Sequence, residues 1–129
     1  MVDDEPSSCK YICEAVEHEG YEPIAFASVS DCLNGLPAAT HEEKPLAMII
    51  DVMMPEADGI DLMRGLAEIK SSIPIIITSA RGEFYIRAAQ RLGTVWNLPI
   101  AATFTKPINH ASLGLVLEKL SQVQSGHSQ

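Results

Sequence analysis

The chain has 129 residues, a formal net charge of −8, 47% hydrophobic residues and 20% charged residues. A chain of this length forms one domain, and this composition is typical of a folded protein rather than a disordered one. The acidic balance argues against broad binding to nucleic acid or to an anionic membrane surface. No apolar run is long enough to span a membrane, and three cysteines without a CxxC pair indicate a reduced, cytoplasmic protein.

Hydrophobic periodicity predicts alternating helices and strands in the first half of the chain. Apolar residues at helical spacing indicate helices, whereas alternating or continuous apolar runs indicate strands. In chain order, the expected elements are a helix over about 8–19 ended by Gly20, a strand over 24–27, a helix over 30–36 and a strand over 46–51. The last of these is continuously apolar up to Asp51, as in a strand that is covered on both faces.

The second half continues the same alternation. Its expected elements are a helix after the Asp58-Gly59 turn, a strand over 74–79, a helix over 83–95, a strand over 100–105 and a helix over 110–123. Strands that alternate with helices form a parallel sheet with right-handed crossovers. We therefore expect one α/β domain over residues 1–123, followed by a polar tail over residues 124–129.

Polar residues stand at the expected carboxyl ends of the strands, where ligands of such sheets bind. They are Asp3, Asp4, Asp51, Ser79 and Lys106. Three carboxylates repel one another unless a cation neutralises them, and Mg²⁺ does so through oxygen ligands. A lysine ammonium and a serine hydroxyl can hold an anion, and an aspartate can act as a nucleophile that forms an acyl phosphate. The pattern predicts a site for a phosphoryl group.

Four segments carry a resemblance to a known family. They are Val2-Asp3-Asp4-Glu5-Pro6, Ile49-Ile50-Asp51-Val52-Met53-Met54-Pro55-Glu56-Ala57-Asp58-Gly59, Pro74-Ile75-Ile76-Ile77-Thr78-Ser79-Ala80 and Phe104-Thr105-Lys106-Pro107-Ile108. In these segments and their order, the chain resembles the receiver domains of two-component response regulators over almost its whole length. The resemblance implies a flavodoxin-like fold, with a five-stranded parallel sheet of order 2-1-3-4-5 between two layers of helices.

The resemblance also implies which residues accept phosphate and bind metal. Asp51 would be the phosphoacceptor, taking the phosphoryl group from a sensor histidine kinase or a phosphotransfer protein. Asp4, Asp51 and the main-chain carbonyl of Met53 would bind Mg²⁺ directly, whereas Asp3 would act mostly through a metal-bound water. The chain would then be a signalling domain and not an enzyme, with self-phosphotransfer and autodephosphorylation as its only catalysis.

Two further residues would contact the phosphoryl oxygens according to the same resemblance. Ser79 would supply the switch hydroxyl, because its distance from Pro74 favours it over Thr78. Lys106 would supply a positive charge, and the Lys106-Pro107 peptide would be cis, as non-trans peptides in proteins almost always precede proline.

Several features depart from the family pattern. Only two residues precede the acidic pair, so the first strand would be truncated or the natural start would lie upstream. The family usually carries an aromatic residue three positions before the lysine, where this chain has Thr103 followed by Phe104. The chain is several residues longer around 91–99 than the most compact receivers. The residues after Val123 are too few for an output domain, so we expect a stand-alone regulator or a receiver cut from a longer chain.

The resemblance finally implies partners. Phosphorylation would alter the face formed by the helix over 83–95, the strand over 100–105 and the helix over 110–123. That face would then bind a partner or a second copy of the chain as a homodimer. A short likeness over residues 88–92 and 98–100 suggests an output domain or protein of the cyclic-di-GMP phosphodiesterase type. We expect no direct contact with nucleic acid or membrane.

Three other functions compete with a working receiver. A pseudo-receiver would bind partners without taking phosphate. A haloacid-dehalogenase-like phosphatase also uses an aspartate nucleophile with Mg²⁺, but its motif needs a second aspartate where this chain has Met53. A flavodoxin-like FMN carrier would need a phosphate loop rich in serine, threonine and glycine after the first strand, and none follows Asp4.

Two sets of residues outside this pattern have alternative interpretations. Cys9 and Cys13 lie four residues apart on one helix and could bind metal or sense oxidation, but they fit better as small buried hydrophobic residues, as does Cys32. Trp96, the only tryptophan, could form part of a partner surface or anchor its own loop.

Overall fold

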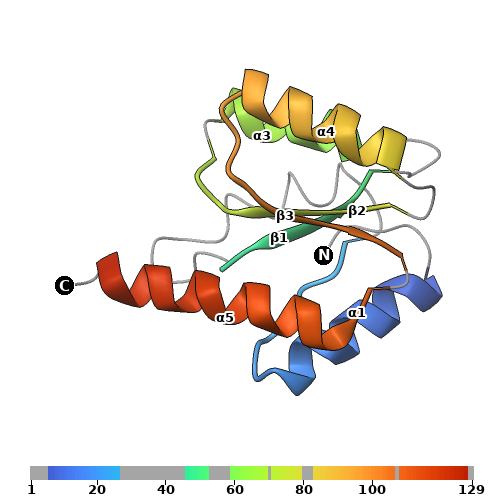
Figure 1. Ribbon diagram of the computed structural model, residues 1–129, viewed down its shortest axis with the longest axis vertical. Helices are drawn as coiled ribbons and strands as arrows, with labels where there is room; N and C mark the ends of the chain where they lie inside the picture. Colours follow the sequence, from blue (N-terminus) through green and yellow to red (C-terminus); the bar gives the residue numbers. More distant parts are fainter. Residues whose placement is uncertain are drawn as a thin grey trace.

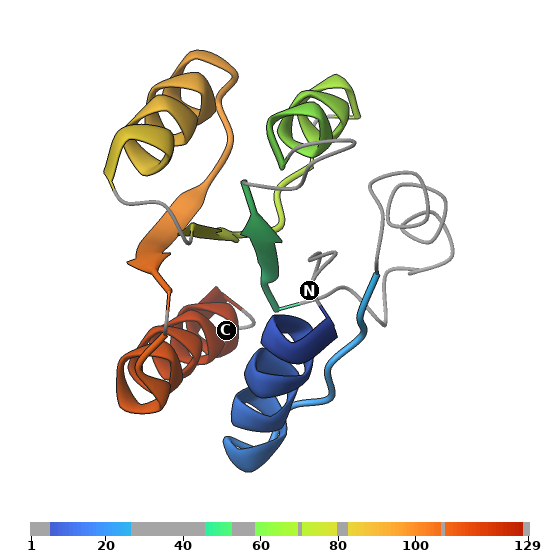
Figure 2. The ribbon, with the colours of Figure 1, turned by 90° about the vertical axis from the view of Figure 1, so that its right-hand side faces the viewer.

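The computed structural model describes residues 6–26, 46–52, 59–69, 71–79, 83–106 and 108–127. Its elements are α1 (Pro6–His18), β1 (Met48–Asp51), α3 (Gly59–Glu68), β2 (Ile75–Ser79), α4 (Glu83–Val95), β3 (Ile100–Thr105) and α5 (His110–His127). The strands form a parallel sheet in the order β1-β2-β3. Helices α3 and α4 cover one face of the sheet, and α1 and α5 cover the other (Figure 1 and Figure 2). This arrangement confirms the predicted α/β fold with helices on both faces.

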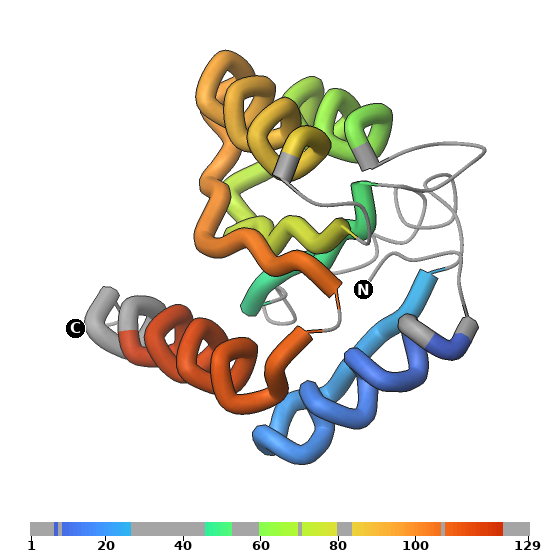
Figure 3. The backbone as a smooth tube through the Cα atoms, turned by 45° about the vertical axis from the view of Figure 1, so that its right-hand side comes forward, coloured from blue at the N-terminus to red at the C-terminus, as the bar shows by residue number. Residues whose placement is uncertain are grey.

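The described sheet corresponds to the last three strands of the predicted order. The expected first strand and the helix over 30–36 lie outside the described residues. Residues 21–25 form no ladder, and among the described residues 24–26 of the strand expected over 24–27, only Phe26 makes an isolated β-bridge. This segment runs back beside α1 toward the sheet (Figure 3).

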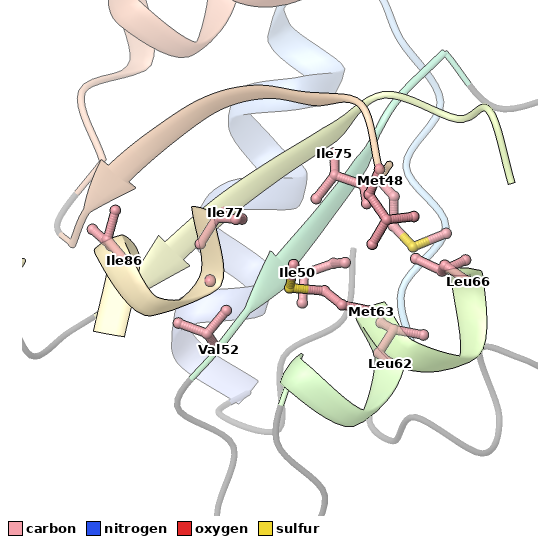
Figure 4. Close-up of a cluster of buried hydrophobic side chains, with 11 residues drawn as sticks. Met48, Ile50, Val52, Leu62, Met63, Leu66, Ile75, Ile77 and Ile86 are labelled. Carbon is pink, nitrogen blue, oxygen red and sulfur yellow. The ribbon is translucent and has the colours of Figure 1, made fainter. Parts of the chain in front are cut away.

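Two apolar clusters hold the helices against the sheet, one on each face. Every residue of β1 and β2 is buried, because a parallel strand covered on both faces meets apolar side chains on both sides. The α3/α4 cluster, shown in Figure 4, comprises Met48, Ile50, Val52, Leu62, Met63, Leu66, Ile75, Ile77, Ile86, Ala89 and Leu98. The α1/α5 cluster comprises Ile12, Ala15, Val16, Ile49, Ile76, Ile108, Leu113 and Leu117.

The end of α1 confirms the expected role of Gly20. The N–H of Tyr21 donates to the carbonyl of Val16 over 3.1 Å, and the N–H of Gly20 donates to the carbonyl of Glu17 over 2.9 Å. This pair of bonds is a Schellman motif, which requires a positive φ at the residue after the helix. Gly20 has a φ of 90°, where an L side chain would be strained.

A second motif of the same kind ends α4 within the region of extra length. Leu98 donates to the carbonyl of Gly93 over 2.8 Å, and Asn97 donates to that of Thr94 over 3.2 Å. Asn97 has a φ of 57°, which asparagine tolerates better than most residues. The stretch over residues 91–99, where we predicted additional length, forms the last turn of α4 and the tight reversal after it.

Trp96 anchors this reversal to the neighbouring helix. Its side chain is partly buried against the α3/α4 cluster. The guanidinium carbon of Arg64, on α3, lies 5.9 Å from the centroid of the indole ring, which is within the range of a cation–π interaction. Of the two interpretations of Trp96, these contacts support the anchor.

β3 contains a bulge near its start. Ile75 pairs with Ile100, but the next residue of β2, Ile76, pairs with Ala102. Ala101 is thus an extra residue that has no partner in β2, as in a β-bulge. Beyond the bulge the ladder continues in regular register to the carboxyl ends of both strands.

The prediction for the C-terminal helix was wrong at its end. We expected the helix to stop at Val123 and a polar tail to begin at residue 124, whereas α5 continues to His127. The residues beyond Val123 are polar but include no proline, and polar side chains by themselves do not end a helix. Among the described helices, none is long and apolar enough to cross a bilayer.

Candidate functional site

Three of the predicted site residues lie at one edge of the sheet. Asp51 is the last residue of β1, Ser79 is the last residue of β2, and Lys106 directly follows β3. Asp51 pairs with Thr78 in the ladder, and Ser79 pairs with Thr105, so the three strand ends are level with one another. This is the carboxyl edge of a parallel sheet, where ligands of such folds bind.

Asp51 and Lys106 form an ion pair at this edge. The ammonium Nζ of Lys106 donates to Oδ2 of Asp51 over 3.1 Å, and the two side chains are only 13% and 7% exposed, in that order. A carboxylate removed from water requires a partner of opposite charge or several hydrogen-bond donors. The pair therefore supplies a buried carboxylate together with a cation that faces it.

The backbone of Lys106 is held by the sheet. Its N–H donates to the carbonyl of Ser79 over 2.8 Å, which continues the β2–β3 ladder by one residue. On the other side of β2, the N–H of Val52 donates to the carbonyl of Thr78 over 3.1 Å. The main chain on both sides of β2 is thus fixed at the level of the ion pair.

The two neighbouring hydroxyl residues of β2 have different environments. Thr78 and Ser79 are both fully buried. The Thr78 hydroxyl donates to the carbonyl of Ile50 over 3.4 Å, which is a contact inside the sheet. Ser79 lies one residue further along, at the strand end beside Asp51 and Lys106.

The structure also shows what replaces the expected aromatic residue before the lysine. Thr103 pairs with Ile77, whose side chain belongs to the α3/α4 cluster. Phe104 packs against the α1/α5 cluster on the other face of the sheet. Since successive residues of a strand face opposite sides, Phe104 cannot substitute for an aromatic residue at position 103.

The remaining predicted site residues lie outside the described part of the chain. They are Asp3, Asp4 and Met53, together with the turn residue Asp58 and Pro107. Of the expected magnesium ligands, only Asp51 is described, and its carboxylate is the hard oxygen donor that Mg²⁺ prefers. Among the described residues, no three His, Cys, Asp or Glu side chains come close enough together to hold a metal ion.

Sequence reasoning missed one residue near this edge. Tyr11, on α1, donates its hydroxyl to the carbonyl of Ile108, two residues after Lys106, over 3.0 Å. Tyr11 is 43% exposed, and no sequence pattern around it predicts a hydrogen bond to a carbonyl that is distant in the chain. Only the packing of α1 beside the start of α5 brings the two groups together.

The cysteines of α1 are less buried than we expected for small core residues. Cys9 and Cys13 are partly buried free thiols. Burial raises the pKa of the Cys13 thiol, and the neighbouring Cys9 thiol raises it further. A raised pKa disfavours the thiolate, the form that reacts and binds metal, and so favours the packing interpretation. Cys32 lies outside the described residues.

Comparison with known proteins decides the family to which this fold belongs. The model of the response regulator receiver domain matches residues 1–117. The chain belongs to the response regulator receiver domain family. This receiver is 32% identical to a response regulator from Colwellia psychrerythraea, whose crystal structure superposes with a TM-score of 0.78 over 94% of this chain and 93% of that one. FixJ-N, at 22% identity and a TM-score of 0.76, shares the fold over 94% of this receiver and 90% of its own chain.

Curated relatives of the receiver are longer regulators. It is 31% identical over 83 residues to the alkaline phosphatase synthesis transcriptional regulatory protein PhoP of Bacillus subtilis, covering 64% of this chain and 33% of that protein. It is 30% identical over 114 residues to the response regulator protein TmoT of Ectopseudomonas mendocina, covering 88% of this chain and 47% of that protein. The receiver thus spans a third to about half of the length of these relatives.

Family membership establishes the general role of the domain. As a response regulator receiver domain, the chain is a signalling domain of two-component systems. Aspartate phosphorylation and magnesium are typical of the family.

Proposed function

We propose that this receiver accepts a phosphoryl group on Asp51, from a histidine kinase or a phosphotransfer protein, in a Mg²⁺-dependent reaction. The observation that carries this proposal is the buried ion pair between Asp51 and Lys106 at the carboxyl edge of the sheet. A carboxylate at this edge with a fixed cation beside it is placed to be phosphorylated and to have the added charge neutralised.

In the proposed reaction, an oxygen of Asp51 forms a bond to phosphorus while the bond from phosphorus to the donor breaks. The donor atom leaves with the electron pair of the broken bond, and Asp51 becomes an acyl phosphate. Lys106, already 3.1 Å from Oδ2, exchanges this contact for one with a phosphoryl oxygen. Asp4, Asp51 and the Met53 carbonyl would hold Mg²⁺, with Asp3 acting through water, and the bound ion would neutralise charge on the phosphoryl oxygens.

Ser79 is the better candidate for the switch hydroxyl. Thr78 already donates its hydroxyl to the carbonyl of Ile50 within the sheet. Ser79 is the last residue of its strand, one position beyond the ladder partner of Asp51, and its carbonyl accepts a hydrogen bond from the N–H of Lys106. A contact between the Ser79 hydroxyl and the phosphoryl group would favour one of two arrangements of the chain after β2, which is how phosphorylation would bias the domain.

The signal would leave through the face formed by α4, β3 and α5. We propose that this face binds an output protein or domain, or a second copy of the receiver. Our candidate for the output stays a protein or domain of the cyclic-di-GMP phosphodiesterase type. A DNA-binding transcriptional output is a second candidate, because PhoP and NtrC are named as transcriptional regulators. Because Phe104 faces the α1/α5 cluster, any coupling from Ser79 to this face would proceed without an aromatic residue at position 103. A cytoplasmic location accords with such partners.

The test is intact mass spectrometry after incubation with Mg²⁺ and acetyl phosphate. We expect one phosphoryl adduct on the wild type, none on Asp51→Asn, and none when EDTA is added before the phosphodonor. No adduct on a folded wild type would contradict the proposal and favour a pseudo-receiver. Multiple turnover of a small phosphate ester would instead indicate a phosphatase.

A pair of neighbouring variants tests the assignment of the hydroxyl. Ser79→Ala should change the rate of phosphoryl gain or loss, because it removes a contact with the phosphoryl group. Thr78→Val, its matched control, should lower the free energy of unfolding by about 1 kcal/mol through the lost hydrogen bond, with little effect on those rates. The reverse result would assign the switch hydroxyl to Thr78.

A further inference from the structure

A tyrosine of α1 holds the chain segment that follows Lys106. The hydroxyl of Tyr11 donates to the carbonyl of Ile108 over 3.0 Å. The Tyr11 ring also packs on the imidazole of His110, the first residue of α5, with ring centroids 4.5 Å apart and planes inclined by 50°. One side chain thus contacts the connection between β3 and α5 at Ile108 and the first residue of α5, His110.

This contact completes a set of restraints on both sides of Lys106. Before it, β3 is paired with β2, and the N–H of Lys106 itself donates to Ser79. After it, the side chain of Ile108 is only 3% exposed within the α1/α5 cluster, and its carbonyl accepts the bond from Tyr11. The main chain that carries the ammonium group is therefore fixed at its downstream end by a residue of another helix.

We propose that Tyr11 is a positioning residue for Lys106, in that its hydrogen bond to Ile108 keeps the ammonium group at the distance where it can receive a phosphoryl oxygen of Asp51. The inference rests on the proposed phosphorylation of Asp51. Positioned charges accelerate a reaction because they need no rearrangement when charge develops. A looser connection after Lys106 would allow the ammonium group to leave that position.

The same pair of helices contains a matched contact that lies far from the site. Tyr21, in the turn after α1, donates its hydroxyl to the carbonyl of Leu117 in the middle of α5 over 3.3 Å. Tyr11 and Tyr21 thus make the same kind of bond, from the α1 side to a carbonyl on the α5 side, across the interface seen in Figure 2. Only the Tyr11 bond reaches the connection next to Lys106, so Tyr21→Phe is the control for Tyr11→Phe.

The first measurement is the rate of phosphoryl uptake from acetyl phosphate in the presence of Mg²⁺. We expect Tyr11→Phe to slow uptake three- to fivefold, at most about the factor that corresponds to one ordinary hydrogen bond. Tyr21→Phe should keep the wild-type rate, although both variants should lower the melting temperature by a similar small amount. Equal rates in the two variants would overturn the proposal and leave Tyr11 with a purely structural role.

A second measurement separates positioning from general destabilisation. In a Lys106→Ala background, Tyr11→Phe should have no further effect on uptake, because no ammonium group is left to position. A three- to fivefold loss that persists in this background would contradict the proposal.

A third measurement does not depend on phosphorylation. The coupling between Asp51 and Lys106, taken from a double-mutant cycle in urea denaturation, should fall in Tyr11→Phe but not in Tyr21→Phe. If the wild type takes no phosphoryl group, the proposed function fails; the coupling then still shows whether Tyr11 positions Lys106. If the wild type is phosphorylated and the coupling is unchanged by Tyr11→Phe, only the present inference fails.

Discussion

Replacing Lys106 by methionine should destabilise the fold strongly, because it leaves the Asp51 carboxylate without its cation. The substitution keeps most of the aliphatic length of the side chain and removes only the charged end. Asp51 is 7% exposed, so water cannot take the place of the ammonium group without entering the site. The effect should therefore be that of a buried charge that has lost its cation and not that of a lost surface contact.

Breaking a buried ion pair on one side costs about 3–5 kcal/mol. Asp51 has further interactions in the structure, so we expect the lower end of that range, about 3 kcal/mol. For a domain of this size, each kcal/mol lowers the melting temperature by roughly 3 °C, which predicts a fall of about 10 °C. The exposed pair of Asp61 and Arg64, with side chains 54% and 60% exposed and 3.5 Å apart, provides the control. Asp61→Asn should cost at most about 0.5 kcal/mol.

Urea denaturation of the wild type, Lys106→Met, Asp51→Asn and the double variant measures the coupling between the two charges. We expect a coupling of at least about 2 kcal/mol, together with partial recovery of Lys106→Met by Mg²⁺, which can neutralise the freed carboxylate. A loss in Lys106→Met no larger than that in Asp61→Asn, or a coupling near zero, would refute the reasoning that the pair is a closed, buried interaction.

Three further predictions follow from individual residues. Gly114→Ala should stabilise α5 by up to about 1 kcal/mol, because alanine favours the helix more than glycine does, and should therefore raise the melting temperature. The new methyl group would meet only the flexible end of Glu19, 2.7 Å away. A lower melting temperature would show that Glu19 cannot move. Gly93→Ala should lower stability by about 1–2 kcal/mol in urea denaturation, since its methyl group would lie 2.7 Å from Cγ1 of Ile100, which packs in the core; an unchanged midpoint would contradict this. Burial raises the pKa of Cys13, so peptide-level iodoacetamide labelling should set in at higher pH in the folded chain than in urea, and the opposite order would refute it.

Much of the fold could be predicted because its signals are local and mutually consistent. The bounds of α4 and β3 agree with those expected: apolar residues recur at helical spacing in α4, and β3 is a short segment between the end of α4 and Lys106. Asp51 was placed at the end of its strand by the break in a continuous apolar run. The end of α5 was missed because polar residues after Val123 do not by themselves stop a helix. Element ends depend on capping and solvent contact more than on periodicity.

The candidate site was predictable as a set of residue types, but its detailed geometry was not. The topology of a parallel sheet places Asp51 and Lys106 at one edge, so their proximity followed once the strands were identified. The contact of Tyr11 with Ile108 depends on how α1 packs beside α5, and residues so distant in sequence carry no mutual signal. The roles of Asp3 and Asp4 stay predictions from family resemblance.

The bulge at Ala101 has a consequence for how chains of this kind can vary in length. Before it, the path of the chain is determined by the end of α4 and the reversal that follows; after it, every residue of β3 is paired in register with β2 up to the level of Ser79. Because Ala101 has no partner in β2, the path of the chain before it does not determine the register of the residues after it. Insertions or deletions in the reversal can be absorbed at position 101, and the lysine at the far end of the strand keeps its place opposite Asp51.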